Sequence, residues 1–219
     1  MIELAPGLIH HPGYLDAAAQ RALAADLAAI LREAPPFIPT MPRTGKPFSV
    51  RMSNCGPLGW VSDRAGYRYQ AEHPETGRPW PSMPAAVTRA WVELAGCPAE
   101  PEACLVNLYA PGTRMGLHQD RDEAEFSAPV LSLSLGATAL FRYGGLRRSD
   151  PTRSVRLSSG DALVIGGPSR LIFHGVDRLV PAAPADLLAP EAGPVLPEAV
   201  APGGRLNLTL RRVTAIGRA

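Results

Sequence analysis

The sequence contains no long apolar run, and no stretch approaches the roughly 18 residues that a membrane-spanning helix requires. Met1 is not followed by a basic segment and an apolar core, so we expect no secretory signal peptide. The apolar share of 46% is ordinary for a globular protein. Together these features predict a soluble, cytoplasmic protein that does not enter a membrane.

Cysteine is scarce. The three cysteines, Cys55, Cys97 and Cys104, form no CxxC pair, and an odd number of thiols cannot all be bridged within the chain. A disulfide scaffold or a structural zinc site is therefore not expected, and reduced, partly buried thiols are the simpler interpretation.

Lysine is nearly absent, because only Lys46 among the 22 basic residues is a lysine. Arginine suits forked contacts to carboxylates and phosphates, although a genome rich in Ala, Gly, Pro and Arg codons would give the same count. The formal net charge is only +2, so overall charge does not indicate nucleic-acid binding. A local basic patch could still provide it.

Two segments have the pattern of helices. Residues Asp16 to Glu33 are rich in Ala and Leu and begin with an Asp N-cap, and the prolines at 35 and 36 end the segment. Residues Pro84 to Gly96 place apolar side chains at helical spacing. Between them, residues 37–80 are rich in Gly, Pro and aromatics, which favours short strands and loops.

From about residue 103 the pattern changes to short strands separated by turns. This spacing predicts a sandwich or jelly roll, with the two helices covering one of its sheets. The expected strands are Cys104–Tyr109, Val130–Leu135, Ala139–Tyr143, Arg153–Leu157, Ala162–Ile165, Leu171–His174 and Arg205–Val213. Residues 181–204 are rich in Ala and Pro, and we expect a flexible surface insertion there.

The short sequence His118-Gln119-Asp120 is a candidate metal site. In a strand, residues two apart share a face, so His118, Asp120 and Asp122 are predicted to point inward while Gln119, Arg121 and Glu123 point away.

A later histidine, His174, is expected to end a strand and to complete a set of two imidazoles and one carboxylate. Such a set suits Fe(II), Mn(II) or Zn(II) and leaves coordination positions open on iron, as an oxygenase requires. The alternative is a hydrogen-bonded His-Asp pair in the core. The remaining histidines, His10, His11 and His73, are expected in loops.

The last predicted strand has one polar and one apolar face. Arg205, Asn207, Thr209 and Arg211 alternate with three leucines that would pack into the core. An unpaired buried guanidinium is costly, so a buried polar face would need an anion, whereas a solvated edge strand would not. The two arginines are six residues apart, about 20 Å along an extended strand, so their side chains must converge to contact one small ligand.

Several sequence motifs occur together and in order. They are SNCGPLGW at 53–60, GYRY at 66–69, LVNLYAPG at 105–112, LHQDRDE at 117–123, FRYGGLRRSDP at 141–151, HG at 174–175 and RLNLTLR at 205–211. In these motifs the chain resembles the AlkB family of iron(II)- and 2-oxoglutarate-dependent dioxygenases, over nearly all of residues 48–212. Residues 37–47 match poorly, and the 181–204 insertion is longer than the resemblance suggests.

The resemblance implies a fold and a set of ligands. The fold is mainly β with flanking helices: a double-stranded β-helix, or jelly roll, with an N-terminal nucleotide-recognition lid. The implied divisions are an extension and helix at 1–36, a lid at 37–82, and a helix plus catalytic core at 83–219, in one compact domain. The implied iron ligands are His118, Asp120 and His174, and the implied 2-oxoglutarate contacts are Asn107, Tyr109, Arg205, Asn207 and Arg211.

The resemblance also implies a substrate and a reaction. The implied substrate contacts are Met52, Trp60, Tyr67, Tyr69, Asp122 and Arg148, with Trp60 and His174 enclosing a flipped base and Asp122 at the base edge. The implied activity is repair of 1-methyladenine and 3-methylcytosine in single- or double-stranded DNA, or in RNA. It uses O2 and 2-oxoglutarate and releases formaldehyde, succinate and CO2. We expect a monomer.

Three alternatives remain open on the residues alone. A related hydroxylase would act on RNA, protein or lipid. A jelly-roll protein that binds nucleic acid without catalysis would not need the intact His-Asp-His set. A cupin-like metal-dependent isomerase would not need the pair of arginines on the last strand.

Overall fold

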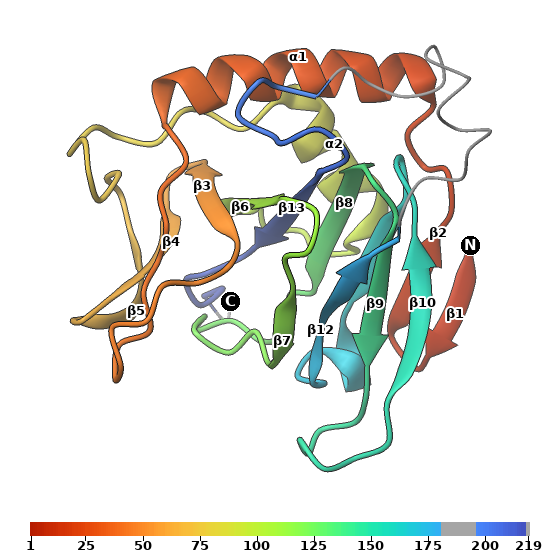
Figure 1. The fold of residues 1–219 in the computed structure, drawn as a ribbon. Helices are drawn as coiled ribbons and strands as arrows, with labels where there is room; N and C mark the ends of the chain where they lie inside the picture. The colour runs from red at the N-terminus through yellow and green to blue at the C-terminus, as the bar shows by residue number, and fades with distance from the viewer. Residues whose placement is uncertain (181–195, 218–219) are drawn as a thin grey trace.

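Two antiparallel sheets face each other in the computed structural model, which describes residues 1–180 and 196–217. The larger sheet has seven strands, in the order β1 (Ile2–Ala5), β2 (Leu8–His11), β11 (Ala162–Ile165), β8 (Val130–Gly136), β13 (Arg205–Arg211), β6 (Ala103–Tyr109) and β3 (Arg51–Cys55). The smaller has four, in the order β10 (Arg153–Leu157), β9 (Ala139–Tyr143), β12 (His174–Leu179) and β7 (Met115–His118). Figure 1 shows this arrangement, which is the expected jelly roll.

Alternation along β8 shows how the larger sheet separates two environments. Its leucines face a cluster that includes both helices, while Ser132 and Ser134 face the space between the sheets. A second apolar cluster, with side chains such as Phe141, Leu163 and Val176, occupies part of that space. The cavity described below therefore lies between the sheets, and the helices lie outside it.

The two expected helices form where their patterns predict them. Helix α1 spans Ala17–Glu33, and the Asp16 carboxylate accepts a hydrogen bond from the backbone N–H of Ala19 at 2.8 Å. Helix α2 spans Ala85–Leu94 and buries Trp91 almost completely. Both pack on the outer face of the larger sheet (Figure 1), and none of the described helices is long and apolar enough to cross a membrane.

The region between the helices divides between two structures. Strand β3 pairs with β6 and so belongs to the larger sheet. Strands β4 (Gly59–Asp63) and β5 (Gly66–Gln70) pair only with each other and form a separate ribbon next to β3 (Figure 1). A short 3₁₀ helix at Gly167–Ser169 completes the described elements.

The N-terminal segment departs from the sequence prediction. Strands β1 and β2 extend the larger sheet, so His10 and His11 lie in a strand and not in a loop. His10 is buried and its Nε2 lies 2.9 Å from Asp161 Oδ2, which ties β2 to the turn before β11. Alternation over only four residues per strand is too short to distinguish these strands from loops in the sequence.

Two other expectations need correction. The sequence predicted a strand at Leu171–His174, whereas in the structure a strand, β12, begins at His174. Leu171 lies outside any strand, and its carbonyl accepts a hydrogen bond from the Gln119 side chain. The expected insertion falls partly outside the described residues, at 181–195. Its remainder, 196–204, packs on the protein, and Val200 is buried against the cluster beneath the helices.

Candidate metal centre and anion pocket

One cavity of about 880 Å³ opens between the two sheets. It is lined from both sheets, from the β4–β5 ribbon and from the loop that follows β7. Every site residue that the sequence suggested lines it: Met52, Trp60, Tyr67, Tyr69, Asn107, Tyr109, His118, Asp120, Asp122, Arg148, His174, Arg205, Asn207 and Arg211.

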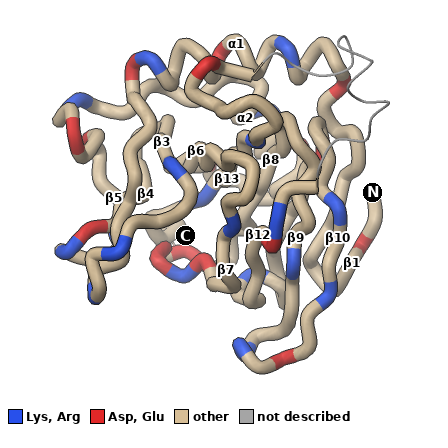
Figure 2. Tube along the Cα trace, viewed as in Figure 1, with Lys and Arg blue, Asp and Glu red and all other residues tan. Residues whose placement is uncertain are grey.

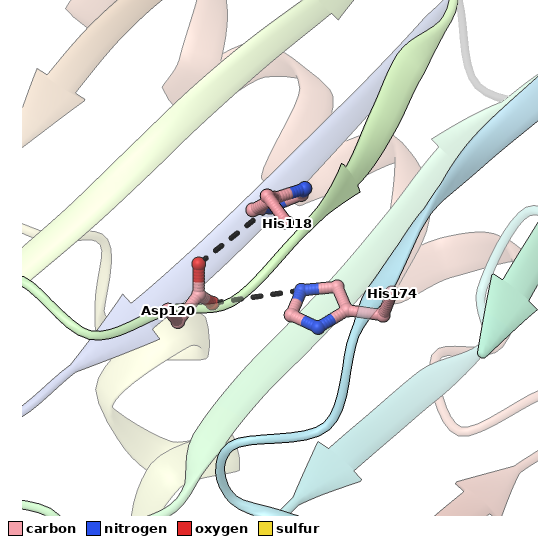
Figure 3. Close-up of side chains that lie close together, drawn as sticks. All are labelled: His118, Asp120 and His174. Carbon is pink, nitrogen blue, oxygen red and sulfur yellow. Dashed lines mark ion pairs between the residues drawn. The ribbon is translucent and has the colours of Figure 1, made fainter. Parts of the chain in front are cut away.

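His118, Asp120 and His174 lie close together (Figure 3), and all three line this cavity. Each offers one ligand atom, and the three atoms lie within 4.8 Å of one another. Nε2 of His118 is 3.6 Å from Asp120 Oδ1, and Nε2 of His174 is 3.8 Å from Asp120 Oδ2. These distances are too long for hydrogen bonds and leave room for a cation among the three groups.

Backbone carbonyls orient both imidazoles. Nδ1 of His118 lies 2.9 Å from the Gly116 carbonyl, and Nδ1 of His174 lies 3.1 Å from the Ile172 carbonyl. If each Nδ1 carries the proton that these contacts require, each Nε2 presents a lone pair toward Asp120. This is the arrangement by which proteins fix metal-binding histidines.

Electrostatics keep His174 and Asp120 in their ligand forms. Burial, aided by His118, lowers the pKa of His174 to about 4, so its imidazole is neutral near pH 7. Burial by itself would raise the pKa of Asp120, but the Arg211 guanidinium outweighs it and holds that pKa well below its usual range. Imidazole nitrogens and one carboxylate are a donor set that fits Fe(II).

The sequence predicted that Asp120 and Asp122 lie on a strand, and this prediction is wrong, although both residues line the cavity. Strand β7 ends at His118, so residues 119–123 do not alternate between faces. Glu123, which was expected to point away, is buried and lines the cavity. The loop conformation that brings Asp120 inward depends on contacts distant in the sequence.

Strand β13 carries the polar face that its sequence predicted. It lies between β8 and β6, so it is not an edge strand. Its three leucines are buried beneath the helices, while Arg205, Asn207 and Arg211 line the cavity. Asn107 and Tyr109 stand directly opposite Asn207 and Arg205 on β6, which places these polar groups on one wall.

Arg205 is a buried cation without a carboxylate partner among the described residues. Only 1% of its surface is exposed, and it donates to neutral oxygens: the carbonyls of Ala137 and Leu157 and the hydroxyl of Ser134. Its Nε has no hydrogen-bond partner in the part of the chain described. Burial lowers the pKa of Arg205 to about 10, which still leaves it charged near pH 7. An anionic ligand would satisfy this group.

Arg211 connects the anion pocket to the metal centre. One of its terminal nitrogens lies 2.9 Å from Asp120 Oδ2. Its Nε lies 3.2 Å from Glu123 Oε1, without the angle of a hydrogen bond, and its Nη1 has no partner among the described residues. Nε of Arg205 and Nη1 of Arg211 are therefore buried donors that a small anion such as 2-oxoglutarate fits.

Aromatic residues form the outer wall of the cavity. The indole of Trp60 stacks on Tyr67, with 5.7 Å between ring centroids and 18° between planes. Its N–H donates to Asp122 Oδ2 at 2.9 Å, so the ribbon contacts the loop after β7. Tyr69 donates to Glu123 deeper in the wall, and Arg148 donates to the Leu117 carbonyl at 2.8 Å from the opposite side.

The structure does not favour His174 as one face of a base-binding slot. Its side chain is 7% exposed, and its ring lies near Phe141, at 5.7 Å, and near His118, at 4.5 Å. The side chain of His118 is 40% exposed. Of the two imidazoles, therefore, His118 is the one that a planar ligand entering from outside can reach.

Sequence reasoning missed the residues that hold the loop after β7. The Arg170 guanidinium, 4% exposed, donates to the carbonyls of Asp120 at 2.6 Å and Ala128 at 2.9 Å, and to Glu123 Oε2 at 3.1 Å. Glu123 in turn accepts the hydroxyl hydrogen of Tyr69. No local pattern marks Arg170, because its partners are about 40 to 50 residues earlier in the chain, as the separations 42, 47 and 50 show.

Comparisons with known proteins show the family of this chain. Residues 7–211 match the 2OG-Fe(II) oxygenase superfamily. The chain is 52% identical to the alpha-ketoglutarate-dependent dioxygenase AlkB homolog of Caulobacter vibrioides, over 96% of this chain and 90% of that protein. It is 44% identical to the alpha-ketoglutarate-dependent dioxygenase AlkB of Salmonella typhimurium, over 80% and 82%. The solved structure of OsALKBH1 has a TM-score of 0.75 and 31% identity, covering 96% of this chain and 99% of that one.

Proposed function

The chain belongs to the 2OG-Fe(II) oxygenase superfamily, and from its cavity and its AlkB relatives we propose that it oxidatively demethylates alkylated nucleobases in nucleic acid. It is a dioxygenase that uses Fe(II) and 2-oxoglutarate. The substrates we propose are 1-methyladenine and 3-methylcytosine in DNA, single- or double-stranded, and in RNA. The observation that carries this proposal is one cavity that joins the His-Asp-His set, a buried arginine without a carboxylate and an aromatic outer wall.

His118, Asp120 and His174 would hold the iron, since their free donor atoms converge. Arg205 would bind a carboxylate of 2-oxoglutarate, because its buried charge has no other anionic partner among the described residues. Arg211 would hold both Asp120 and the cosubstrate. When bound, iron together with 2-oxoglutarate and O2 would supply the oxidation of the N-methyl carbon, with succinate, CO2 and formaldehyde as products.

The outer wall would receive the base. Trp60 and His118 are only partly buried, and aromatic rings are the groups by which enzymes grip a flipped base. 1-Methyladenine and 3-methylcytosine carry positive charge, so the Asp122 carboxylate and the π face of Trp60 are favourable neighbours. Asp122 accepts the indole hydrogen of Trp60, and we infer that an exocyclic amine of the base would take this contact over.

The remaining residues would exclude water and position the reactants. Tyr69 and Glu123 close the cavity wall beside Arg211, and Arg148 would contact the nucleotide from the loop after β9. Enclosure matters because a site closed to water prevents side reactions at the reacting groups. The alkylated bases also pair poorly, which lowers the cost of extruding them from a duplex.

A direct test uses mass spectrometry of short DNA and RNA oligonucleotides that carry single methyl lesions. Each is incubated with the protein, Fe(II), 2-oxoglutarate and O2. Loss of one methyl group, with stoichiometric succinate and formaldehyde, is expected for 1-methyladenine and 3-methylcytosine in DNA. Succinate formation without demethylation of any oligonucleotide would instead indicate a hydroxylase with another substrate, and the absence of succinate would indicate a protein without this catalysis.

A further inference from the structure

The outer face of the smaller sheet carries arginines that the proposed site does not use. The strand register shows where they lie. Arg142 on β9 pairs with Ser154 on β10. Leu140 on β9 pairs with Arg156 of β10 on one side and with Arg178 of β12 on the other. Directly paired residues share a face of a sheet. Arg142, two positions from Leu140, therefore stands on the same face as Arg156 and Arg178.

Burial shows that this face points away from the cavity. Ala139, Phe141 and Tyr143 on β9 are buried in the cluster between the sheets, whereas Arg142 is exposed. Arg156 and Arg178 are also exposed. We call Arg142, Arg156 and Arg178 the arginine face.

Within its sheet the arginine face has one carboxylate neighbour for its three cations. The only carboxylate on the four strands is Asp177, which lies 3.0 Å from the adjacent Arg178. Arg142 and Arg156 form no ion pair with any residue that the structure describes. Diagonal neighbours such as these have Cα atoms about 7–8 Å apart, and positions two strands apart are separated by about 10 Å. Three positive charges at this spacing favour a ligand with repeated negative charge.

Basic residues also connect the arginine face to the cavity. Arg148 lines the cavity and Arg147 is exposed beside it in the loop between β9 and β10, and exposed Arg153 begins β10. Figure 2 shows basic positions at this loop and along β9, β10 and β12. The carboxylate of Asp150, in the same loop, accepts a hydrogen bond from the backbone N–H of Arg147 at 2.9 Å.

We propose that the arginine face binds the sugar-phosphate backbone of the same polynucleotide whose alkylated base enters the cavity, several nucleotides away from that base. This inference rests on the proposed function. Phosphate contacts by arginine position a nucleic acid without reading its sequence. A polynucleotide fits better than an acidic protein, because the basic residues Arg147, Arg148 and Arg153 connect the arginine face to the proposed nucleotide site.

The test compares a methylated trinucleotide with a methylated single strand of about 20 nucleotides, long enough to leave the cavity and cross the face. One variant combines Arg142→Gln, Arg156→Gln and Arg178→Gln. The matched control combines Arg21→Gln, Arg32→Gln and Arg89→Gln, which removes the same charge from exposed positions on α1 and α2. Binding and KM are measured at several salt concentrations, and thermal unfolding verifies that both variants fold.

We expect the arginine-face variant to process the trinucleotide as the parent does and to bind the long strand more weakly. Each phosphate contact to a single strand contributes about 0.7 to the slope of log K against log salt, so losing three contacts should reduce the slope by about 2. The control variant should match the parent on both substrates. A slope and affinity for the long strand equal to those of the parent would overturn the proposal.

A second measurement uses the unaltered protein. Arginine-selective chemical modification, read by mass spectrometry, should be suppressed at Arg142, Arg156 and Arg178 by the long strand and not by the trinucleotide. Equal modification with both would also overturn the proposal. If neither substrate is demethylated, the proposed function fails instead; demethylation of both without a length effect rejects only the arginine face.

Discussion

Removing the guanidinium of Arg170 should destabilise the protein strongly, because this buried cation holds the loop that carries Asp120. Arg170→Met keeps most of the side-chain volume and deletes the contacts to Asp120, Ala128 and Glu123. Breaking a buried ion pair by removing one partner typically costs about 3–5 kcal/mol. For a domain of this size, 3 kcal/mol corresponds to a fall in Tm of about 6–12 °C.

A double-mutant cycle can isolate the interaction energy of the ion pair between Arg170 and Glu123. Glu123→Gln alone leaves Arg170 buried without a carboxylate, so it should cost a similar amount. The double variant removes both charges, and Arg211 retains Asp120. We therefore expect the double variant to lose less than the sum of the single variants, with a coupling of about 1–3 kcal/mol. Urea unfolding of the protein without iron, followed by circular dichroism, measures each value.

Two further measurements make the reasoning refutable. Arg21→Met, on the exposed face of α1, is the control and should change stability by less than about 0.5 kcal/mol. Because Arg170 anchors the backbone of Asp120, its loss should also weaken Fe(II) binding by about 10- to 100-fold. A cost below about 1 kcal/mol for Arg170→Met, or strictly additive single variants, would show that the network does not hold this loop.

Three other substitutions test the proposed roles directly. His118→Ala should abolish succinate and formaldehyde release; retained turnover in a coupled assay would remove His118 from the metal set. Arg205→Met should raise the KM for 2-oxoglutarate about 10- to 100-fold, since a hydrogen bond to a charged group contributes about 1.5–3 kcal/mol, while Fe(II) affinity changes little; an unchanged KM would exclude the carboxylate contact. Trp60→Ala should weaken binding of methylated oligonucleotides while uncoupled succinate formation persists, and Trp60→Phe, which keeps an aromatic face but loses the N–H to Asp122, should retain more binding. Equal binding by all three Trp60 proteins would remove this residue from the substrate wall.

Local pattern was enough for the regular elements. The capped, Ala-rich segment became α1, and alternating residues placed β9, β10 and β11 at their predicted bounds. The alternation on β13 also predicted correctly that its leucines pack into the core; the sequence left open whether its arginines are buried, and the structure places them in the cavity wall. These features follow from side-chain periodicity, which a single segment carries by itself.

The prediction that side chains alternate between two faces was wrong where the chain leaves regular structure. Asp120 was assigned to the interior as part of a strand, yet β7 ends at His118 and the loop is held by Arg170 and Arg211. For the same reason the sequence predicted that Glu123 points outward, although Glu123 is buried between two arginines. Hydrogen bonds between residues 40 or more positions apart leave no periodic trace, so no local pattern could have indicated them.

The sequence by itself determined the class of the fold, the set of polar residues available for chemistry and, through its ordered motifs, the resemblance to a family. Only the tertiary structure decided that the two imidazoles and the carboxylate converge, that Arg205 is buried without a carboxylate among the described residues, and that His118 is the accessible imidazole. The physical reason is that burial and charge pairing depend on which distant strands become neighbours. Strands β13 and β6 meet across a separation of about 100 residues, as the contact between Asn107 and Asn207 shows.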